Sequence, residues 1–288
     1  MSRKLRRWRA AAVQMTSTED REKNLAVAHR LTRRAAEEGA ALVALPENFS
    51  YLRLAPRNRY ADDLDGEMVD RLRDWAATFR IHLLAGSIPE RIPGSRRVHN
   101  TSLLLSPRGE ILAVYRKLHL FDIHLRGRAV FEESKRVAAG NDTVVADTPL
   151  GRLGLSICYD LRFPELYRRL VMAGAQVLLV PAAFTAYTGK FHWLPLLQAR
   201  AIENQCFVLA PAQTGAHGGD RASHGHSVLL DPWGSIVALR RRGAGVLLGE
   251  VDLDRLDEIR AGLPCLQHAR SDLLGRSAFS RQRARHQG

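Results

Sequence analysis

The sequence predicts an α/β protein built as a four-layer αββα sandwich, in which two β-sheets pack face to face and helices cover both outer faces. Apolar runs of strand length alternate with segments whose apolar residues recur every three or four positions. The strands are too many for one small open sheet. No Pro/Gly/Ser-rich linker divides the chain, so we expect one domain over residues 9–274, with basic tails at 1–8 and 275–288.

The first half of the chain combines five expected strands with two helices. Apolar positions from Leu25 to Ala35 recur at helical spacing, and Gly39 then closes the helix. A second helical pattern runs from Met68 to Phe79. The strands are apolar runs, and a Ser-Pro-Arg-Gly turn separates the last two. They cover residues 8–15, 41–45, 81–86, 101–105 and 111–115.

The second half repeats this alternation. Pro164 begins a helix that Gly174 ends, in keeping with the preference for proline at the first helical position and glycine after the last. A later helix is expected over residues 194–205, with Pro195 tolerated in its first turn. The strands are short and apolar, as is typical of strands buried on both faces. They cover residues 153–157, 177–180, 206–212, 226–230, 236–239 and 246–251.

The chain is strongly basic. A formal charge of +13 results from 43 Lys and Arg against 30 Asp and Glu. The basic residues are scattered, without a groove-reading motif or interleaved aromatic residues, so we interpret them as solvated surface arginines and expect no specific nucleic-acid partner. A scaffold that binds polyanions through this basic surface is the alternative from a different class of function.

The sequence also indicates where the protein resides. No apolar run is long enough to span a membrane, and the basic N-terminus lacks the apolar stretch of a secretory signal. The three cysteines have no paired spacing, which argues against a disulfide framework and fits a reducing compartment. We therefore expect a cytoplasmic protein with no membrane partner.

Cys158 occupies the most informative position in the sequence. It follows the apolar strand pattern 153–157, and a helix start follows it in turn. The N-terminal end of a helix offers unpaired N–H groups and a positive dipole end, which stabilise a thiolate and any anion that forms beside it. A lone cysteine among apolar residues is, however, more often packed in a core. The position of Cys158 therefore identifies a catalytic cysteine only if partner residues are found elsewhere in the chain.

Three ionisable residues could be those partners. Glu47 comes directly after the buried strand 41–45, where partial desolvation is expected to raise its pKa toward the range of a general base. Lys117 follows the strand 111–115, and Glu133 lies in a loop between Lys117 and Cys158. Each of the three, taken alone, would more often be an exposed loop residue.

Together these residues form an ordered pattern. The segments are Leu-Pro-Glu47-Asn-Phe, Tyr-Arg-Lys117-Leu-His-Leu and Ile-Cys158-Tyr-Asp-Leu-Arg-Phe-Pro-Glu. In this respect the chain resembles the nitrilase superfamily of carbon-nitrogen hydrolases, which use a Glu-Lys-Cys triad supported by a second Glu. The resemblance runs from about Arg9 to Leu274 and assigns the second Glu to Glu133. It implies the superfamily's αββα fold and a pairing of subunits into at least a homodimer.

Further segments narrow the resemblance to the Nit branch. Within that branch the chain is more similar to the deaminated glutathione amidases than to ω-amidases, which act on α-ketoglutaramate. A departure is His224, where these relatives usually carry Tyr. An ω-amidase, an N-carbamoyl amino acid hydrolase or a true nitrilase remains the alternative. The segments that carry the resemblance begin at Pro181, Thr188, Gln198, Ala212, Gly225, Asp231 and Leu263.

The resemblance implies cleavage of a primary amide to a carboxylate and ammonia through a thioester. Glu47 would take the proton of Cys158, and the thiolate would attack the amide carbon. Lys117 and the backbone N–H of Tyr159 would stabilise the oxyanion. Glu133 would orient Lys117, and no cofactor is required.

Substrate contacts are less well defined by the sequence. Arg162 could hold a substrate carboxylate or could brace Asp160 and Glu165 across the turn. Phe184 and Thr185 could form a pocket wall, with a core position for Phe184 as the alternative. Other conspicuous residues suggest no further chemistry. Cys206 and Cys265 are expected to be packing residues, and His217, His224 and His226 lack the accompanying ligands of a metal site.

Overall fold

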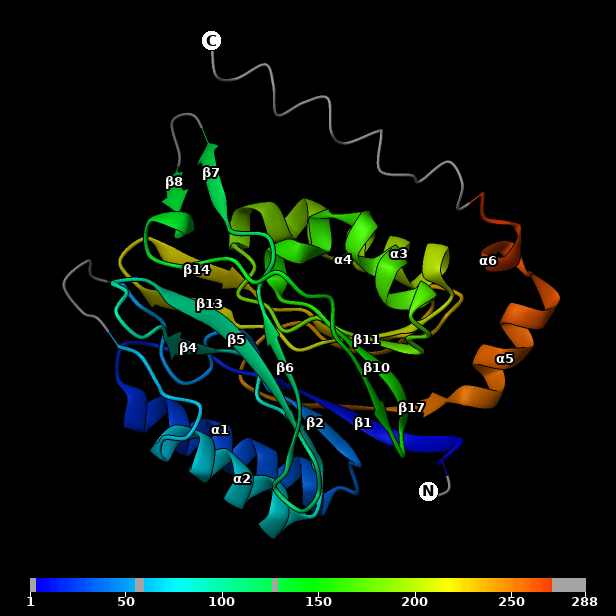
Figure 1. Ribbon diagram of the computed structural model, residues 1–288, viewed down its shortest axis with the longest axis horizontal. Helices are drawn as coiled ribbons and strands as arrows, with labels where there is room; N and C mark the ends of the chain where they lie inside the picture. Colours follow the sequence, from blue (N-terminus) through cyan, green and yellow to red (C-terminus); the bar gives the residue numbers. More distant parts are fainter. Residues whose placement is uncertain (1–3, 55–59, 126–128, 271–288) are drawn as a thin grey trace.

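Two sheets pack face to face in the computed structural model, which describes residues 4–54, 60–125 and 129–270. Helices α1 and α2 cover the outer face of one sheet, and α3 and α4 cover the outer face of the other (Figure 1). The predicted four-layer αββα sandwich is therefore confirmed. The C-terminal tail and the last residues of the predicted domain lie outside the described residues, so those boundaries stay a prediction.

The first sheet has seven strands in the order β17-β1-β2-β3-β5-β4, with β6 paired to β5. Strands β1, β2 and β3 are parallel, and the other pairs are antiparallel. The strands are β1 (Arg7–Gln14), β2 (Leu42–Ala44), β3 (His82–Leu84), β4 (Ile88–Arg91), β5 (Val98–Leu105), β6 (Ile111–Arg116) and β17 (Gly245–Asp252). Its covering helices are α1 (Arg21–Glu37) and α2 (Glu67–Phe79).

The second sheet has six strands in the order β16-β15-β12-β11-β10-β9, and its central strands β10, β11 and β12 are parallel. The strands are β9 (Val145–Thr148), β10 (Gly151–Leu155), β11 (Val177–Leu179), β12 (Phe207–Ala210), β15 (Ser227–Leu230) and β16 (Ile236–Arg240). Its covering helices are α3 (Pro164–Met172) and α4 (Ala186–Asn204), while α5 (Leu253–Gly262) and α6 (Cys265–His268) follow β17.

Strand β1 shows how the layers are held together. Successive side chains of a strand point to opposite faces, so a strand between two apolar layers must be apolar throughout. Ala10 and Ala12 face the core between the two sheets, whereas Ala11 and Val13 face the separate core beneath α1 and α2. All four side chains are fully buried. The small side chains of this strand allow close packing on both of its faces.

Two hairpins extend the sandwich on one side, and the sequence analysis missed both. They are β7 (Asp122–Leu125) with β8 (Ala129–Glu132), and β13 (Thr214–Gly218) with β14 (Arg221–His224). Figure 1 shows them near each other. The guanidinium of Arg221 in β14 lies 5.7 Å from the ring centre of Phe131 in β8, so the two hairpins are in contact. A short 3₁₀ helix, η1 (Glu133–Lys135), follows β8 directly.

Two sequence-based expectations are corrected. Strand β10 ends at Leu155, and Cys158 begins a separate 3₁₀ turn, η2 (Cys158–Arg162), before α3 starts. Helix α4 begins at Ala186, eight residues earlier than predicted, because the Thr185 side chain accepts a hydrogen bond from Thr188 N and caps it. Pro195 therefore lies in the helix interior rather than in the first turn. Across the described ranges, no helix is both long and apolar enough to cross a membrane.

Candidate active site

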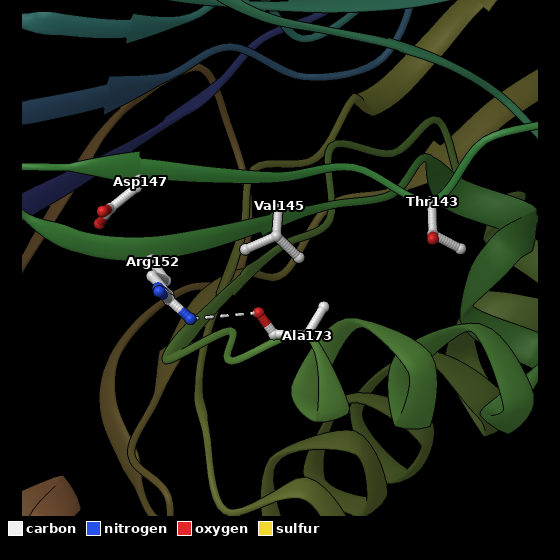
Figure 2. Close-up of a pocket in the computed structure, with 5 residues that line it drawn as sticks. All are labelled: Thr143, Val145, Asp147, Arg152 and Ala173. Atoms are coloured by element: carbon white, nitrogen blue, oxygen red, sulfur yellow. Dashed lines mark hydrogen bonds between the residues drawn. The ribbon is translucent and has the colours of Figure 1, made fainter.

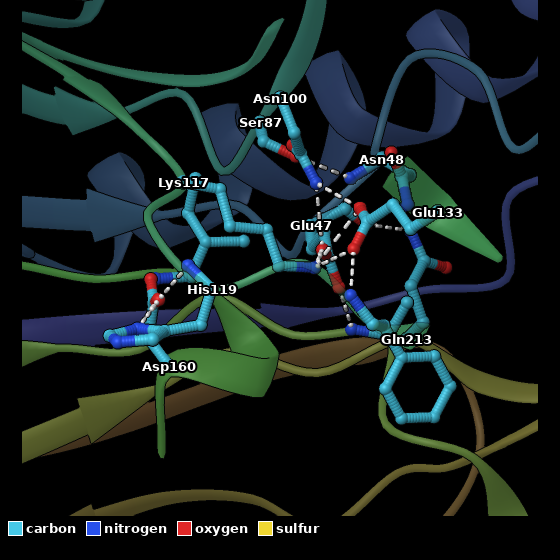
Figure 3. A network of polar contacts seen from close by, with 12 residues as sticks. Glu47, Asn48, Ser87, Asn100, Lys117, His119, Glu133, Asp160 and Gln213 are labelled. Atoms are coloured by element: carbon cyan, nitrogen blue, oxygen red, sulfur yellow. Dashed lines mark hydrogen bonds and ion pairs between the residues drawn. The ribbon is translucent and has the colours of Figure 1, made fainter. Parts of the chain in front are cut away.

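A buried ammonium lies between two carboxylates. Lys117 and Glu47 follow strands of the first sheet, and Glu133 follows β8 of the β7–β8 hairpin. Lys117 Nζ donates to Glu47 Oε1 at 3.0 Å and to Glu133 Oε2 at 2.9 Å (Figure 3). Asn100 Nδ2 also donates to Glu47 Oε1, at 2.9 Å. The thiol of Cys158 is buried beside this group, close enough for the charge of Glu47 to act on it. The structure thus brings together the four residues that the sequence pattern singled out.

Glu47 is positioned by an unusual backbone where β2 ends. Asn48, the next residue, has a φ of 56°, in the left-handed region that few side chains other than glycine adopt. Its N–H donates to Ser87 Oγ at 3.0 Å. A Cβ on Gly86 would lie 2.0 Å from the carbonyl oxygen of Pro46. Glycine at this position therefore lets the chain after β3 approach the loop that carries Glu47.

The second sheet holds the other oxygen of this carboxylate. The N–H of Ala183, which follows β11, donates to Glu47 Oε2 at 2.8 Å. Gln213 Nε2, which precedes β13, donates to the backbone oxygen of Glu47 at 3.0 Å. Because both carboxylate oxygens are engaged, the side chain of Glu47 has one orientation fixed from two layers.

Cys158 is positioned by the buried carboxylate of Asp160. Asp160 accepts hydrogen bonds from Ile157 N at 2.8 Å, from Tyr115 OH at 2.6 Å and from His119 N at 3.0 Å. These bonds close the 3₁₀ turn in which Cys158 has a φ of 48°. The sequence analysis gave Asp160 no role at the site, although its place two residues after the predicted nucleophile was an available signal.

The three central groups share a defined protonation pattern. Burial alone would raise the pKa of Glu47, but Lys117, the Cys158 thiol and the Ala183 N–H together hold it below its ordinary value. Burial alone would lower the pKa of Lys117, but Glu133 and Glu47 hold it well above its ordinary value. Burial and the nearby charge of Glu47 raise the pKa of the Cys158 thiol well above its ordinary value. The resting site therefore contains a carboxylate, an ammonium and a neutral thiol.

This pattern corrects two expectations. The pKa of Glu47 is lowered rather than raised, because the adjacent ammonium outweighs desolvation. The thiolate of Cys158 is not stabilised by a helix end in the resting protein, because the turn that follows is a short 3₁₀ helix and the charge of Glu47 opposes ionisation of the thiol.

Arg162 and Phe184 lie together beside Cys158. The guanidinium of Arg162 lies 5.0 Å from the ring centre of Phe184, and its Nη1 lies 3.1 Å from His192 Nδ1. The sequence had left open that Arg162 contacts Asp160 and Glu165. The observed partners of Arg162 are His192 and Phe184 instead. Phe184 is buried and packs against other aromatic residues of the central core, so it combines a core position with contact to Arg162.

Thr185 and His224 have largely structural surroundings. The Thr185 hydroxyl lies 2.7 Å from that of Thr188 and caps α4. The His224 ring stacks on the His226 ring, with centroids 4.1 Å apart. Partial burial, with a smaller effect of His226, lowers the pKa of His224 to about 4. The imidazole of His224 is therefore neutral at physiological pH.

Within the described residues, no group of three or more His, Cys, Asp or Glu side chains is arranged to hold a metal ion. None of the three cysteines forms a disulfide. Cys206 is buried and its sulfur lies 3.3 Å from Arg260 Nη2, which places it in the packing between β12 and α5.

Two hollows flank the structure without enclosing Cys158. The larger lies on the edge strand β9 and is lined by residues from Thr143 to Ala173, with Arg152 Nη1 donating to Ala173 O at 3.5 Å (Figure 2). The smaller has a volume of about 60 Å³ and adjoins the charged cluster through Asn100 and Glu133. Of these two hollows, only the smaller lies next to the cluster of Glu47, Lys117 and Glu133.

The four-layer α/β sandwich gathers a carboxylate, an ammonium and a thiol between its two sheets. A family model described as carbon-nitrogen hydrolase matches residues 9–261, and the chain belongs to this family. The protein is an amidase of the nitrilase superfamily.

Three relatives illustrate the match. The deaminated glutathione amidase of Synechocystis is 46% identical over 263 residues, covering 90% of this chain and 97% of the relative. The crystal structure of the Caenorhabditis elegans NitFhit protein has a TM-score of 0.87 at 41% identity, covering 95% of this chain and 67% of that one. A mutant amidase from Nesterenkonia sp. AN1 carries the acetamide moiety of fluoroacetamide on its active-site cysteine, with a TM-score of 0.76, 26% identity and coverage of 93% and 95%.

The close approach at Gly86 yields a stability test. Gly86→Ala should lower the free energy of unfolding by about 3 kcal/mol or more and should also impair turnover, because the new Cβ would displace the loop that carries Glu47. Gly94→Ala is the matched control, since Gly94 also has a positive φ but nothing lies within 4 Å of its added Cβ. The control should cost only about 1 kcal/mol. Equal losses in chemical denaturation would contradict the argument.

The depressed pKa of His224 yields a pH test. An unfolded histidine has a pKa of about 6.5, so between this value and the folded value of about 4 the unfolded chain binds the extra proton. The stability contributed by His224 is therefore present above pH 6.5 and is lost as the pH falls toward 4. Between pH 7.5 and pH 4.5 the free energy of unfolding should fall in both proteins. Because His224 is partly exposed, the fall should be smaller in His224→Tyr than in the wild type by about 1–2 kcal/mol. Identical pH profiles for the two proteins would show that the ring is not desolvated.

Proposed function

We propose that the protein hydrolyses deaminated glutathione, with Cys158 as the nucleophile and Glu47, Lys117 and Glu133 as its supporting groups. The observation that carries the proposal is the buried cluster in which Lys117 Nζ lies 3.0 Å from Glu47 and 2.9 Å from Glu133, beside the thiol. The names of the relatives support the substrate, and the covalent adduct on the Nesterenkonia cysteine supports the nucleophile.

The first half of the reaction forms the tetrahedral intermediate, which becomes a thioester when the amine leaves. Glu47 accepts the proton of Cys158, and the thiolate attacks the amide carbon. The ammonium of Lys117 and the N–H of Tyr159 donate to the oxyanion, which is worth roughly 3–4 kcal/mol for each well-placed donor. The neighbouring N–H groups of Cys158 and Asp160 are already bound, to Pro181 O and Ile157 O at 3.0 Å each. This leaves the intervening N–H of Tyr159 as the candidate donor.

The second half of the reaction releases the amine and then the acid. Protonated Glu47 gives its proton to the leaving nitrogen, which breaks the carbon-nitrogen bond. A water molecule enters, Glu47 removes a proton from it, and the hydroxide attacks the thioester. The thiol of Cys158 regains its proton. Glu133 holds Lys117 charged and oriented throughout, through hydrogen bonds at 2.9 and 3.2 Å.

The leaving group distinguishes the candidate substrates. Glutathione is a tripeptide with secondary amide bonds, so hydrolysis of its deaminated form releases a peptide amine and not the ammonia that the sequence analysis expected from a primary amide. Primary amides such as α-ketoglutaramate release ammonia instead. Arg162 suits the carboxylate of the acyl half in both cases, because it lies beside Cys158 and presents a planar guanidinium. Phe184 and the end of α4 at Thr185 then form the adjoining wall.

We also propose that two copies pair through the face of α3 and α4. Met172, Tyr187, Phe191 and Ile202 on these helices are exposed apolar side chains, and Phe191 is 58% exposed. Side chains of this kind on one helical face are typical of a subunit interface. The presence of three cysteines without a disulfide fits residence in the cytoplasm.

The nucleophile is tested by Cys158→Ala. Turnover should fall by at least about 1,000-fold, since no other group can form the thioester. Cys265→Ala, which removes a thiol away from the charged cluster, should retain full activity. Deaminated glutathione, α-ketoglutaramate, an N-carbamoyl amino acid and a simple nitrile should be compared by measuring both free amine and ammonia. Turnover that survives in Cys158→Ala would rule out the proposed mechanism.

The dimer is tested by Phe191→Asp. The charge should dissociate the pair and shift sedimentation velocity to the monomer, because burying an unpaired carboxylate at an interface is costly. Val130→Asp is the control, since Val130 is also 58% exposed but lies on the β7–β8 hairpin. Wild-type protein that sediments as a monomer would contradict this pairing.

A further inference from the structure

A second arginine, besides Arg162, lies near the charged cluster. Arg221 lies at the start of β14, and its guanidinium is positioned by the ring of Phe131 at 5.7 Å and by a hydrogen bond from Nη1 to the backbone oxygen of Arg53. Its charge interacts favourably with the carboxylates of Glu47 and Glu133. The mechanism described above gives this residue no task.

The hairpin that carries Arg221 is fixed to the backbone of Glu47. Gln213, directly before β13, donates through Nε2 to Glu47 O at 3.0 Å and to Ser17 Oγ at 2.7 Å. Within the hairpin, the buried ring of His217 lies 2.8 Å from Ser17 O and 2.8 Å from Ser223 Oγ. These contacts join both strands of the hairpin to the loop of the general base, so the position of Arg221 relative to Glu47 is set by the fold.

An aromatic row connects Arg221 to Arg162. The rings of Phe131 and Phe121 have centroids 5.1 Å apart, and those of Phe121 and Tyr159 are 5.0 Å apart. The guanidinium of Arg162 lies 5.8 Å from the centre of Tyr159. Each end of the row therefore has one guanidinium, and Cys158 precedes the residue at the Arg162 end. A row of rings capped by two cations suits an elongated substrate with a negative charge at each end.

The chemistry determines which half of the substrate lies toward which arginine. Glu47 must reach the leaving nitrogen to return its proton, so the departing half extends from the reaction centre on the Glu47 side. Arg221 is kept on the Glu47 side by its hairpin, which Gln213 ties to the backbone of Glu47. Arg162 lies over Tyr159, the residue after Cys158, to which the acyl half becomes bound. Deaminated glutathione carries a carboxylate on each half.

We infer that Arg221 binds the carboxylate of the departing peptide and thereby makes the site selective for peptide amides over primary amides. This inference rests on the proposed function, because it assigns a residue to one half of that substrate. Arg221 is on this basis a specificity residue that acts in binding, and it takes no part in proton transfer.

Three substrates test this role. They are deaminated glutathione, the same compound with its C-terminal carboxylate converted to an amide, and α-ketoglutaramate, which lacks the departing peptide. Arg221→Gln should lower kcat/KM for deaminated glutathione by about 10- to 100-fold, mainly through KM, as is typical of losing a charged hydrogen bond. It should change kcat/KM for the other two substrates by less than about twofold. Wild-type protein should prefer the free carboxylate over its amide by the same factor.

Two variants provide the controls. Arg221→Lys keeps the charge without the planar guanidinium, and it should fall between the wild type and Arg221→Gln on deaminated glutathione. Arg108→Gln removes one positive charge from the turn after β5, where Arg108 pairs with Glu110 at 3.0 Å, and it should leave all three substrates unaffected. Turnover of α-ketoglutaramate in the same preparation verifies that each variant is folded.

The possible failures are distinguishable. Wild-type protein that cleaves none of the three substrates contradicts the proposed function itself. Normal wild-type turnover combined with an equal loss for all three substrates in Arg221→Gln means that the residue supports the fold or the charge of the cluster, which overturns the inference alone. An unchanged kcat/KM for deaminated glutathione in Arg221→Gln overturns it as well.

Discussion

The burial of one positive charge between two negative ones is the constraint on which the active site depends. The ammonium of Lys117 is almost fully buried, and such a charge is tolerated only with close partners of opposite sign. Glu47 and Glu133 supply them, and their presence keeps the pKa of the lysine well above its ordinary value. The negative charge of Glu47 keeps the adjacent thiol of Cys158 neutral. In the proposed mechanism the thiol loses its proton only when an amide carbon is present for the sulfur to attack.

The same cluster explains why the site lies between two sheets. Lys117 and Glu47 follow strands of the first sheet, whereas Ala183, whose N–H binds the second oxygen of Glu47, follows a strand of the second. The bond from Tyr115 to Asp160 crosses between the sheets in the same way, at 2.6 Å. An entirely apolar contact between the sheets would leave their relative position loosely specified, and these polar bonds fix it.

The sequence was sufficient for features that depend on local patterns. Apolar periodicity predicted the layers, and Cys158 stood out because apolar strand residues precede it. Distances between groups far apart in the chain were not accessible, so the lowered pKa of Glu47 could not be foreseen. The hairpin that carries Arg221 was missed because it contains Gly218 and Gly219 and lacks the apolar alternation that identifies a strand. The start of α4 was missed because polar and aromatic residues there obscure the helical repeat.

The hydrogen bond between Ala183 and Glu47 joins the two sheets, so the geometry of the site depends on how accurately the sheets are aligned. The proposed nucleophile follows a strand of one sheet and the proposed base follows a strand of the other, and the proposed mechanism requires that the two meet within hydrogen-bond distance. A slip of about 1 Å between the sheets would leave every helix and strand intact, yet it would separate thiol from carboxylate. The backbone fold and the reactive geometry are therefore separate properties of this protein, and the second is the more easily lost.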